Sequence, residues 1–101
     1  MNVNLIKKTS RTRYLHQSAK LSAKENHQAR LLLTQSGGTF RVTPDLISFL
    51  SIEKFETIIL LDIYDNPIRV NREHLFSAAT SLYREVMEDW YRTVNKINDL
   101  R

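Results

Sequence analysis

Cysteine is absent from this sequence of 101 residues, and glycine and proline occur only twice each. A chain without cysteine has no disulfide, no thiolate nucleophile and no cysteine-ligated zinc site. Two glycines cannot form the glycine-rich loop that cradles a phosphate group, and no serine lies in a Gly-x-Ser-x-Gly nucleophile elbow. We therefore expect a protein that is not an enzyme and binds no cofactor, with no small-molecule substrate evident.

Long apolar segments are also missing. The longest uninterrupted apolar run is Ile58–Leu61, far shorter than the roughly 18 residues that a membrane-spanning helix needs. The N-terminus lacks the apolar stretch of a signal peptide. The expected location is therefore the cytoplasm, and no membrane partner is expected.

Positive charge is concentrated in the N-terminal third of the chain. Residues 1–38 contain seven Lys and Arg residues and one acidic residue, for a net charge of +6. Residues 39–101 contain eight basic and ten acidic residues, for a net charge of −2. The basic character of the protein is thus expected to come from its N-terminal segment.

Residues 1–18 are predicted to form a basic extended arm, because they carry too few apolar side chains to hold a structure of their own. Ser22 and Glu25 match a capping box and predict a helix over about residues 19–35. The pair Gly37-Gly38 would end that helix and form a flexible joint to the rest. Residues 19–101 are then interpreted as one small domain.

The middle of the chain predicts a short helix and a β-hairpin. The run Thr43-Pro44-Asp45 supplies an N-cap, a first-turn proline and a first-turn acid, which predict a helix over about 44–53. Apart from Asp62, residues 57–63 are apolar or β-branched on both alternating faces, as in a strand with little solvent exposure. Turn residues at 64–67 then predict a hairpin over about 56–71.

A long amphipathic helix is predicted over about residues 72–99, with Asn71 as its N-cap. Apolar residues recur there at spacings of three or four, as on one face of a helix. That face consists of Leu75, Ala79, Leu82, Val86, Trp90, Val94 and Ile97. The stripe is wider than one hairpin covers, so either the two shorter helices or another subunit must cover the remainder. The predicted fold class is α+β.

Neither the histidines nor the carboxylates form a pattern typical of a chemical site. His16, His27 and His74 are far apart, and none has a second ligand at metal-binding spacing on one helix face, so we expect no metal site. Asp65 suits a turn and Asp62 suits a strand edge. Glu73 complements a helix N-terminus. We interpret these carboxylates as structural rather than as an acid–base pair.

Two groups of residues are candidates for binding a macromolecule. Trp, Tyr and Met side chains anchor protein interfaces, although core packing would explain the same residues on the last helix. This predicted protein interface consists of Tyr83, Met87, Trp90 and Tyr91. Basic side chains of the N-terminal segment would contact phosphates of a nucleic acid, dock on a neighbouring protein, or remain solvated. They are Lys7, Lys8, Arg11, Arg13, Lys20 and Lys24.

The segment Leu61-Asp62-Ile63-Tyr64-Asp65-Asn66-Pro67-Ile68-Arg69-Val70, followed by Leu-Tyr-x-Glu-Val-Met-x-x-Trp at 82–90, resembles small uncharacterised proteins of large contractile-tailed bacteriophages, particularly those of cyanobacteria. The resemblance covers the C-terminal half and brings no functional residue with it. It implies a phage-encoded accessory protein or virion structural subunit, located in the host cell cytoplasm or in the virion.

The sequence therefore supports two hypotheses of function. The first is a small interaction or assembly protein that binds a protein partner or a second copy of itself, with the N-terminal arm docked on a neighbouring subunit. The alternative is a nucleic-acid-binding accessory protein that uses the basic arm on phosphates.

Overall fold

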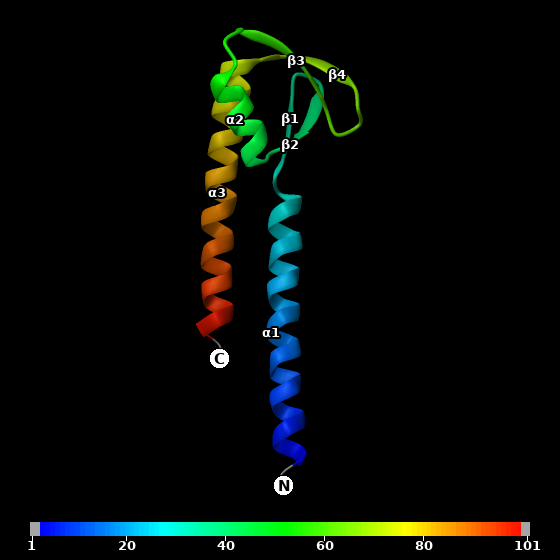
Figure 1. The fold of residues 1–101 in the computed structure, drawn as a ribbon, viewed down its shortest axis with the longest axis vertical. Coiled ribbons are helices and arrows are strands. Elements are labelled where there is room, and N and C mark those ends of the chain that lie inside the picture. Colours follow the sequence, from blue (N-terminus) through cyan, green and yellow to red (C-terminus); the bar gives the residue numbers. More distant parts are fainter. Residues whose placement is uncertain (1–2, 100–101) are drawn as a thin grey trace.

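The computed structural model of the protein describes the backbone of residues 3–99 and the side chains of residues 15–99. This part of the chain has the predicted α+β class (Figure 1). Its elements in chain order are α1 (Val3–Ala29), β1 (Leu32–Gln35), β2 (Gly38–Arg41), α2 (Pro44–Ile52), β3 (Thr57–Leu61), β4 (Pro67–Asn71) and α3 (Arg72–Asp99).

The helix α1 replaces most of the predicted N-terminal arm. An extended conformation was predicted for residues 1–18, and this is wrong for residues 3–18 because they are helical. No glycine or proline occurs before Gly37, so no residue in this segment breaks a helix. Ser22 and Glu25, interpreted as the start of a helix, lie inside α1 instead. The predicted boundary between arm and domain therefore falls within one continuous helix.

The segment that follows α1 is a β-hairpin, not the end of a helix. The helix ends at Ala29 rather than near residue 35, and β1 pairs antiparallel with β2 so that Leu33 lies opposite Phe40. Ser36 and Gly37 connect the strands with φ angles of 56° and 85°. Two consecutive positive φ angles are typical of a type I′ turn, which suits the twist of a two-residue hairpin. The predicted flexible joint is thus a tight turn between paired strands.

The starts of α2 and α3 confirm the predicted caps. The hydroxyl of Thr43 accepts a hydrogen bond from the backbone N–H of Leu46 at 3.1 Å, and Pro44 occupies the first turn of α2. The side-chain oxygen of Asn71 accepts one from the N–H of His74 at 3.0 Å. Each cap satisfies a backbone donor that has no partner within its own helix.

The predicted second hairpin is confirmed as β3 paired antiparallel with β4, with Ile59 opposite Arg69. Alternation along β3 directs Ile58 and Leu60 toward the core. Ile59 and Leu61 on the other face remain 60% and 63% exposed. The prediction that β3 has little solvent exposure is therefore wrong for one of its two faces.

We call α2 and the two hairpins the head. The core lies between the head and α3. One buried cluster joins the residues just before β1 and just after β2 to the middle of α3, and it consists of Leu31, Val42, Ala79 and Val86. A second joins β2, α2 and β4 to the first turns of α3 and consists of Phe40, Leu50, Val70 and Leu75. Both clusters include residues of α3, so this helix is the common support of the head.

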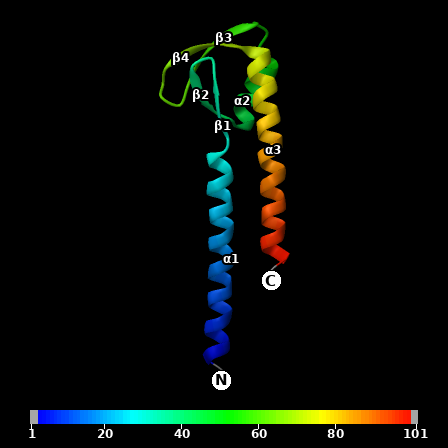
Figure 2. The same ribbon diagram turned by 180° about the vertical axis from the view of Figure 1, so that it is seen from behind.

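Below the head, α1 and α3 run side by side in opposite directions as a two-helix stalk (Figures 1 and 2). A contact of 3.3 Å between His16 and Asn98 lies near the C-terminal end of α3. The molecule measures 68 × 24 × 18 Å, and its radius of gyration is 19.5 Å. A compact domain of this length has a radius of gyration of about 13 Å, so the stalk makes the protein markedly elongated.

The two hairpins meet at Gly38. A Cβ atom at this position would lie only 2.7 Å from Cγ1 of Ile68 on β4. The backbone N–H of Ile63 also donates a hydrogen bond to the carbonyl oxygen of Thr39 at 2.9 Å. Close approach of β2 to the second hairpin therefore requires a residue without a side chain at position 38.

We predict that Gly38→Ala lowers the free energy of unfolding by about 1–3 kcal/mol, because the added methyl group overpacks the contact with Ile68. Urea unfolding followed by far-UV circular dichroism measures the change. As a control in the same turn, Ser36→Asn places asparagine at a left-handed position that it tolerates, so it should not destabilise the protein. Equal stability of Gly38→Ala and the wild type would contradict this account of the hairpin contact.

Candidate functional site: the stalk and its uncovered flank

The seam between α1 and α3 is built around His27. This side chain is 7% exposed, and its Nδ1 donates a hydrogen bond to the carbonyl oxygen of Ala23 at 2.6 Å. The imidazole stacks on the indole of Trp90 with a centroid separation of 5.9 Å and an interplanar angle of 9°. Trp90 thus has one ring face occupied within the chain, which fixes α1 against α3 at this level.

An ion pair lies at the edge of the same seam. The guanidinium of Arg30 donates a hydrogen bond to Oδ2 of Asp89 at 2.6 Å, and Nε2 of His27 lies 3.9 Å from the same oxygen. The hydrogen bond from Arg30 lowers the pKa of Asp89 below its ordinary value, with smaller contributions from nearby positive charge. Both partners are nearly half exposed, so the pair orients the stalk more than it stabilises it.

Beside this seam, α3 carries a flank that no other described element covers completely. Tyr83 and Met87 are half-buried, and Tyr91 is 70% exposed. Tyr83 packs partly against the cluster that contains Leu31. Together with their charged neighbours on α3, these residues border a shallow depression of about 690 Å³. We call Tyr83, Met87 and Tyr91 the α3 flank.

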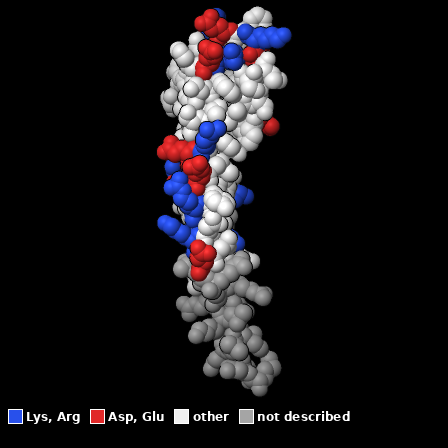
Figure 3. Space-filling model, turned by 90° about the vertical axis from the view of Figure 1, so that its left-hand side faces the viewer, with Lys and Arg blue, Asp and Glu red and all other residues white. Residues whose placement is uncertain are grey.

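A row of charges of alternating sign borders the α3 flank. Arg84, Glu88 and Arg92 are all exposed and follow one another at intervals of one helical turn. Arg92 lies 3.4 Å from Glu88. Figure 3 shows positive and negative side chains interspersed along the stalk and separated by a mostly uncharged belt from those at the top of the head. The flank therefore has an apolar strip with a charged rim, as protein interfaces do.

The predicted interface residues thus differ in their surroundings. Met87 and Tyr91 lie on the surface of the stalk and Tyr83 at the upper end of the same flank. Trp90 belongs to the seam with α1. Sequence periodicity places all of them on α3, but it does not show which side of the stripe α1 covers.

The predicted phosphate-binding residues all belong to α1. Lys20 is half-buried and Lys24 is exposed, one helical turn apart. The backbone of α1 includes the other four positions, Lys7, Lys8, Arg11 and Arg13, whose side chains lie outside the described residues. Whether these cations act on a common ligand stays a prediction.

The carboxylates of the second hairpin have structural partners. Oδ1 of Asp62 accepts hydrogen bonds from the backbone N–H groups of Tyr64 and Asn66 at 2.9 and 3.0 Å. The bond from Asn66 is the main cause of the lowered pKa of Asp62. Asp65 has a φ of 61°, which the turn requires and aspartate tolerates. Glu73 is exposed in the first turn of α3.

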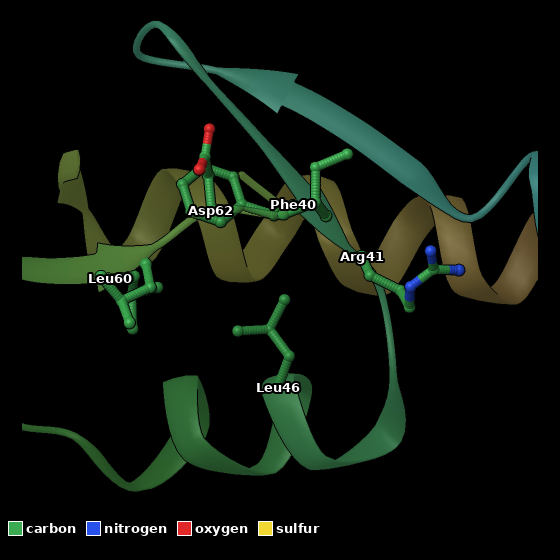
Figure 4. Close-up of a pocket in the computed structure, with 7 residues that line it drawn as sticks. Phe40, Arg41, Leu46, Leu60 and Asp62 are labelled. Carbon is green, nitrogen blue, oxygen red and sulfur yellow. The ribbon is translucent and has the colours of Figure 1, made fainter. Parts of the chain in front are cut away.

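A small crevice of about 240 Å³ opens beside Asp62, between β2, α2 and β3. Leu46 and Leu60 approach each other across it, and the side chain of Arg41 extends away from Asp62 (Figure 4). The crevice thus places no cation opposite the carboxylate. Oδ1 of Asp62 is hydrogen-bonded to the backbone of its own turn.

Two further properties concern the described residues only. No group of three histidine or acidic side chains among them is placed to hold a metal ion. No helix in this part of the chain is both long enough and apolar enough to cross a bilayer.

No protein-family model, curated protein or solved structure matches this chain.

Sequence reasoning missed one exposed apolar surface, which lies on the head. Phe55 and Tyr64 are 72% and 71% exposed, and they flank β3, whose outward residues are Ile59 and Leu61. The sequence did contain a sign of this surface. The residues of β3 are apolar on both faces, and a chain of this length is too short to cover both faces of a hairpin. We interpreted that run as a buried strand instead.

We predict that the Arg30–Asp89 pair makes the protein less stable in acid. Because the pKa of folded Asp89 lies below its ordinary value of 3.8, the unfolded state binds more protons as the pH falls toward that range. The contribution of the pair is therefore present above about pH 4 and is lost at lower pH.

Urea unfolding of the wild type and of Asp89→Asn between about pH 6 and pH 3 tests this prediction. The variant cannot titrate at position 89, so the difference in stability between the two proteins should shrink as the pH falls. Asp62 titrates in both proteins and cancels in the comparison. A difference that is constant with pH would show that Arg30 does not stabilise the ionised carboxylate.

Proposed function

We propose that this protein is a small, non-enzymatic interaction or assembly protein that docks on a protein partner through the α3 flank. The observation that carries the proposal is the exposure of Tyr91 beside Met87, on an ordered helix with a charged rim. Aromatic and methionine side chains in such a setting are the usual anchors of protein interfaces. The resemblance stated above further suggests a phage-encoded accessory protein or virion structural subunit.

The elongated shape supports this proposal. A stalk of two helices has no second layer against which α3 can bury the full width of its apolar stripe, so a partner that supplies another helix or sheet would complete it. The hydrogen bonds of Asp62 to its own turn favour a structural role for that carboxylate over a catalytic one. The function proposed here involves binding and no chemical step.

A site-specific photo-crosslinker at position 91 tests the proposal in cells that produce the natural partners of the protein. We expect one discrete crosslinked protein product. Glu85 is the matched control, since it is exposed on the same helix and lies about one third of a turn away from Tyr91. Crosslinking at neither position, or equally at both, would argue against docking through the α3 flank.

A nucleic-acid-binding function is the second candidate, and the charge of α1 favours it. Between Val3 and Ala29 the chain has six basic residues and one acidic residue. A single helix with this charge can follow the phosphate backbone, where each neutralised phosphate releases counterions. The function would be that of an accessory protein without sequence readout.

Fluorescence anisotropy with labelled DNA and RNA at several salt concentrations tests this second candidate. The logarithm of the affinity should fall linearly with the logarithm of the salt concentration, and Lys20→Gln with Lys24→Gln should reduce the slope by about two units. Lys54→Gln, exposed on the head, should leave the slope unchanged. Affinity that does not respond to salt would exclude phosphate contacts as the source of binding.

A further inference from the structure

The outer face of the second hairpin is a separate apolar surface on the head. Along β3 and β4, alternate residues point away from the core, and Ile59 and Leu61 are the large apolar ones. Leu61 pairs with Pro67, and Ile59 pairs with Arg69. The inner face of the same hairpin packs on Phe40 and Leu50, so β3 is apolar on both sides while only one side is covered.

An exposed aromatic residue lies in the chain beyond each end of β3, on a backbone that is held in place. The carbonyl oxygen of Phe55 accepts a hydrogen bond from Nε of Arg72 at 3.2 Å, and the next carbonyl, that of Glu56, accepts one from the backbone N–H of Arg72 at 2.8 Å. The N–H of Tyr64 donates to Asp62 at 2.9 Å. Phe55 and Tyr64 are thus exposed despite being anchored, so their exposure does not come from loose loops.

The strand residues of this face are arranged symmetrically about Leu60, because Ile59 and Leu61 lie one residue to either side of it. Phe55 precedes β3, and Tyr64 lies in the turn that follows it. A two-fold axis that passes above Leu60, parallel to the plane of the sheet and perpendicular to the strands, would bring Ile59 against the partner's Leu61. The same axis would bring the chain before β3 of one copy near the turn after β3 of the other. A surface that is complementary to itself in this way suits an isologous contact between identical subunits.

We propose that this outer face, which we call the head face (Phe55, Ile59, Leu61 and Tyr64), binds the head face of a second copy of the chain. The two hairpins would stack face to face as two layers about 10 Å apart. The stalks would point in opposite directions, because α1 and α3 extend away from the head (Figure 1). This proposal does not depend on the α3 flank, which stays free in such a dimer.

Charge complementarity supports a second copy as the occupant. Arg69 is the one charged residue on the outer face of the two strands, and Asp65 is an exposed anion in the turn that joins them. The two-fold axis places Arg69 above the partner's Pro67, two residues from the partner's Asp65. Two residues of chain span at most about 7 Å, a distance that an arginine side chain reaches. Each dimer would then contain two equivalent ion pairs.

The available area suits a weak but specific dimer. An exposed side chain of this size contributes on the order of 100 Å² of apolar surface. Four such side chains, with Pro67 and the stem of Arg69, therefore bury on the order of 500 Å² per copy and 1,000 Å² in the pair. This value lies at the lower limit for a specific interface, so we expect association in the micromolar range.

Sedimentation equilibrium of the full chain over a range of concentrations tests the proposal. We expect a monomer–dimer equilibrium for the wild type and a tenfold or greater weakening in Ile59→Lys and Leu61→Lys. Both substituted positions are more than half exposed, so circular dichroism should show unchanged helix content. Tyr91→Lys on the α3 flank and Leu21→Lys on α1 are matched controls and should dimerise as the wild type does.

The outcomes separate this proposal from the function proposed above. A wild type that stays monomeric up to about 0.5 mM, or head-face variants that dimerise normally, would overturn the head-to-head dimer. Loss of dimerisation in Tyr91→Lys alone would overturn it too, because the contact would then lie on the stalk. Docking through the α3 flank is tested by the photo-crosslinker, and its failure would not affect the head face.

The absence of cysteine permits a direct test of the geometry. Chains carrying Ile59→Cys are mixed with chains carrying Leu61→Cys and treated with a short bismaleimide that spans the distance between stacked sheets. We expect efficient heterodimer crosslinking, and little when Tyr91→Cys replaces Leu61→Cys. Equal yields in the two mixtures would overturn the proposed arrangement of the hairpins.

Discussion

Packing against one face of α3 is the constraint on which the rest of the structure depends. Leu75, Ala79 and Val86 are fully buried there, and α1, α2, β1 and β4 all contact this helix. Each hairpin has only two strands, and an isolated two-stranded hairpin is marginally stable in water. The head therefore forms because α3 gives both hairpins and α2 a common apolar surface to cover.

The same constraint explains why apolar surface is left over. A chain of about 100 residues buries only a little more than 60% of the surface that its unfolded form exposes. Here that burial is concentrated where the head meets α3, and within the described part of the chain no further layer covers the stalk or the outer side of the second hairpin. The α3 flank and the head face thus have one physical cause, namely too few elements to cover both sides of α3 and both sides of β3.

Sequence patterns that favour only one local structure predicted that structure correctly. Thr43 and Asn71 cap helices because their side chains satisfy backbone donors within three residues, and no distant contact is needed for that. The turn of the second hairpin is equally local. The glycine pair at 37–38 was misread because glycine suits both a helix end and a type I′ turn. Burial of Leu31 and Phe40 against α3 decided between the two.

The candidate surfaces were also predictable only in part from the sequence. The periodicity of α3 was sufficient to place Tyr83, Met87, Trp90 and Tyr91 on one helix. The stacking of Trp90 on His27 joins residues far apart in the sequence, and no local pattern contains it. The basic charge of the N-terminal segment was evident from composition alone, whereas its continuous helical conformation was not.

The sequence by itself determined the fold class, the caps of α2 and α3, the second hairpin and the excess of apolar residues on α3. These follow from interactions between residues a few positions apart, which are the same in any surroundings. Only the tertiary structure decided that residues 32–41 form a hairpin, that Trp90 packs against α1, and that one face of β3 stays exposed. Each of these outcomes depends on which apolar surfaces meet across the chain, because burial is a property of the assembled layers and not of the segment that supplies them.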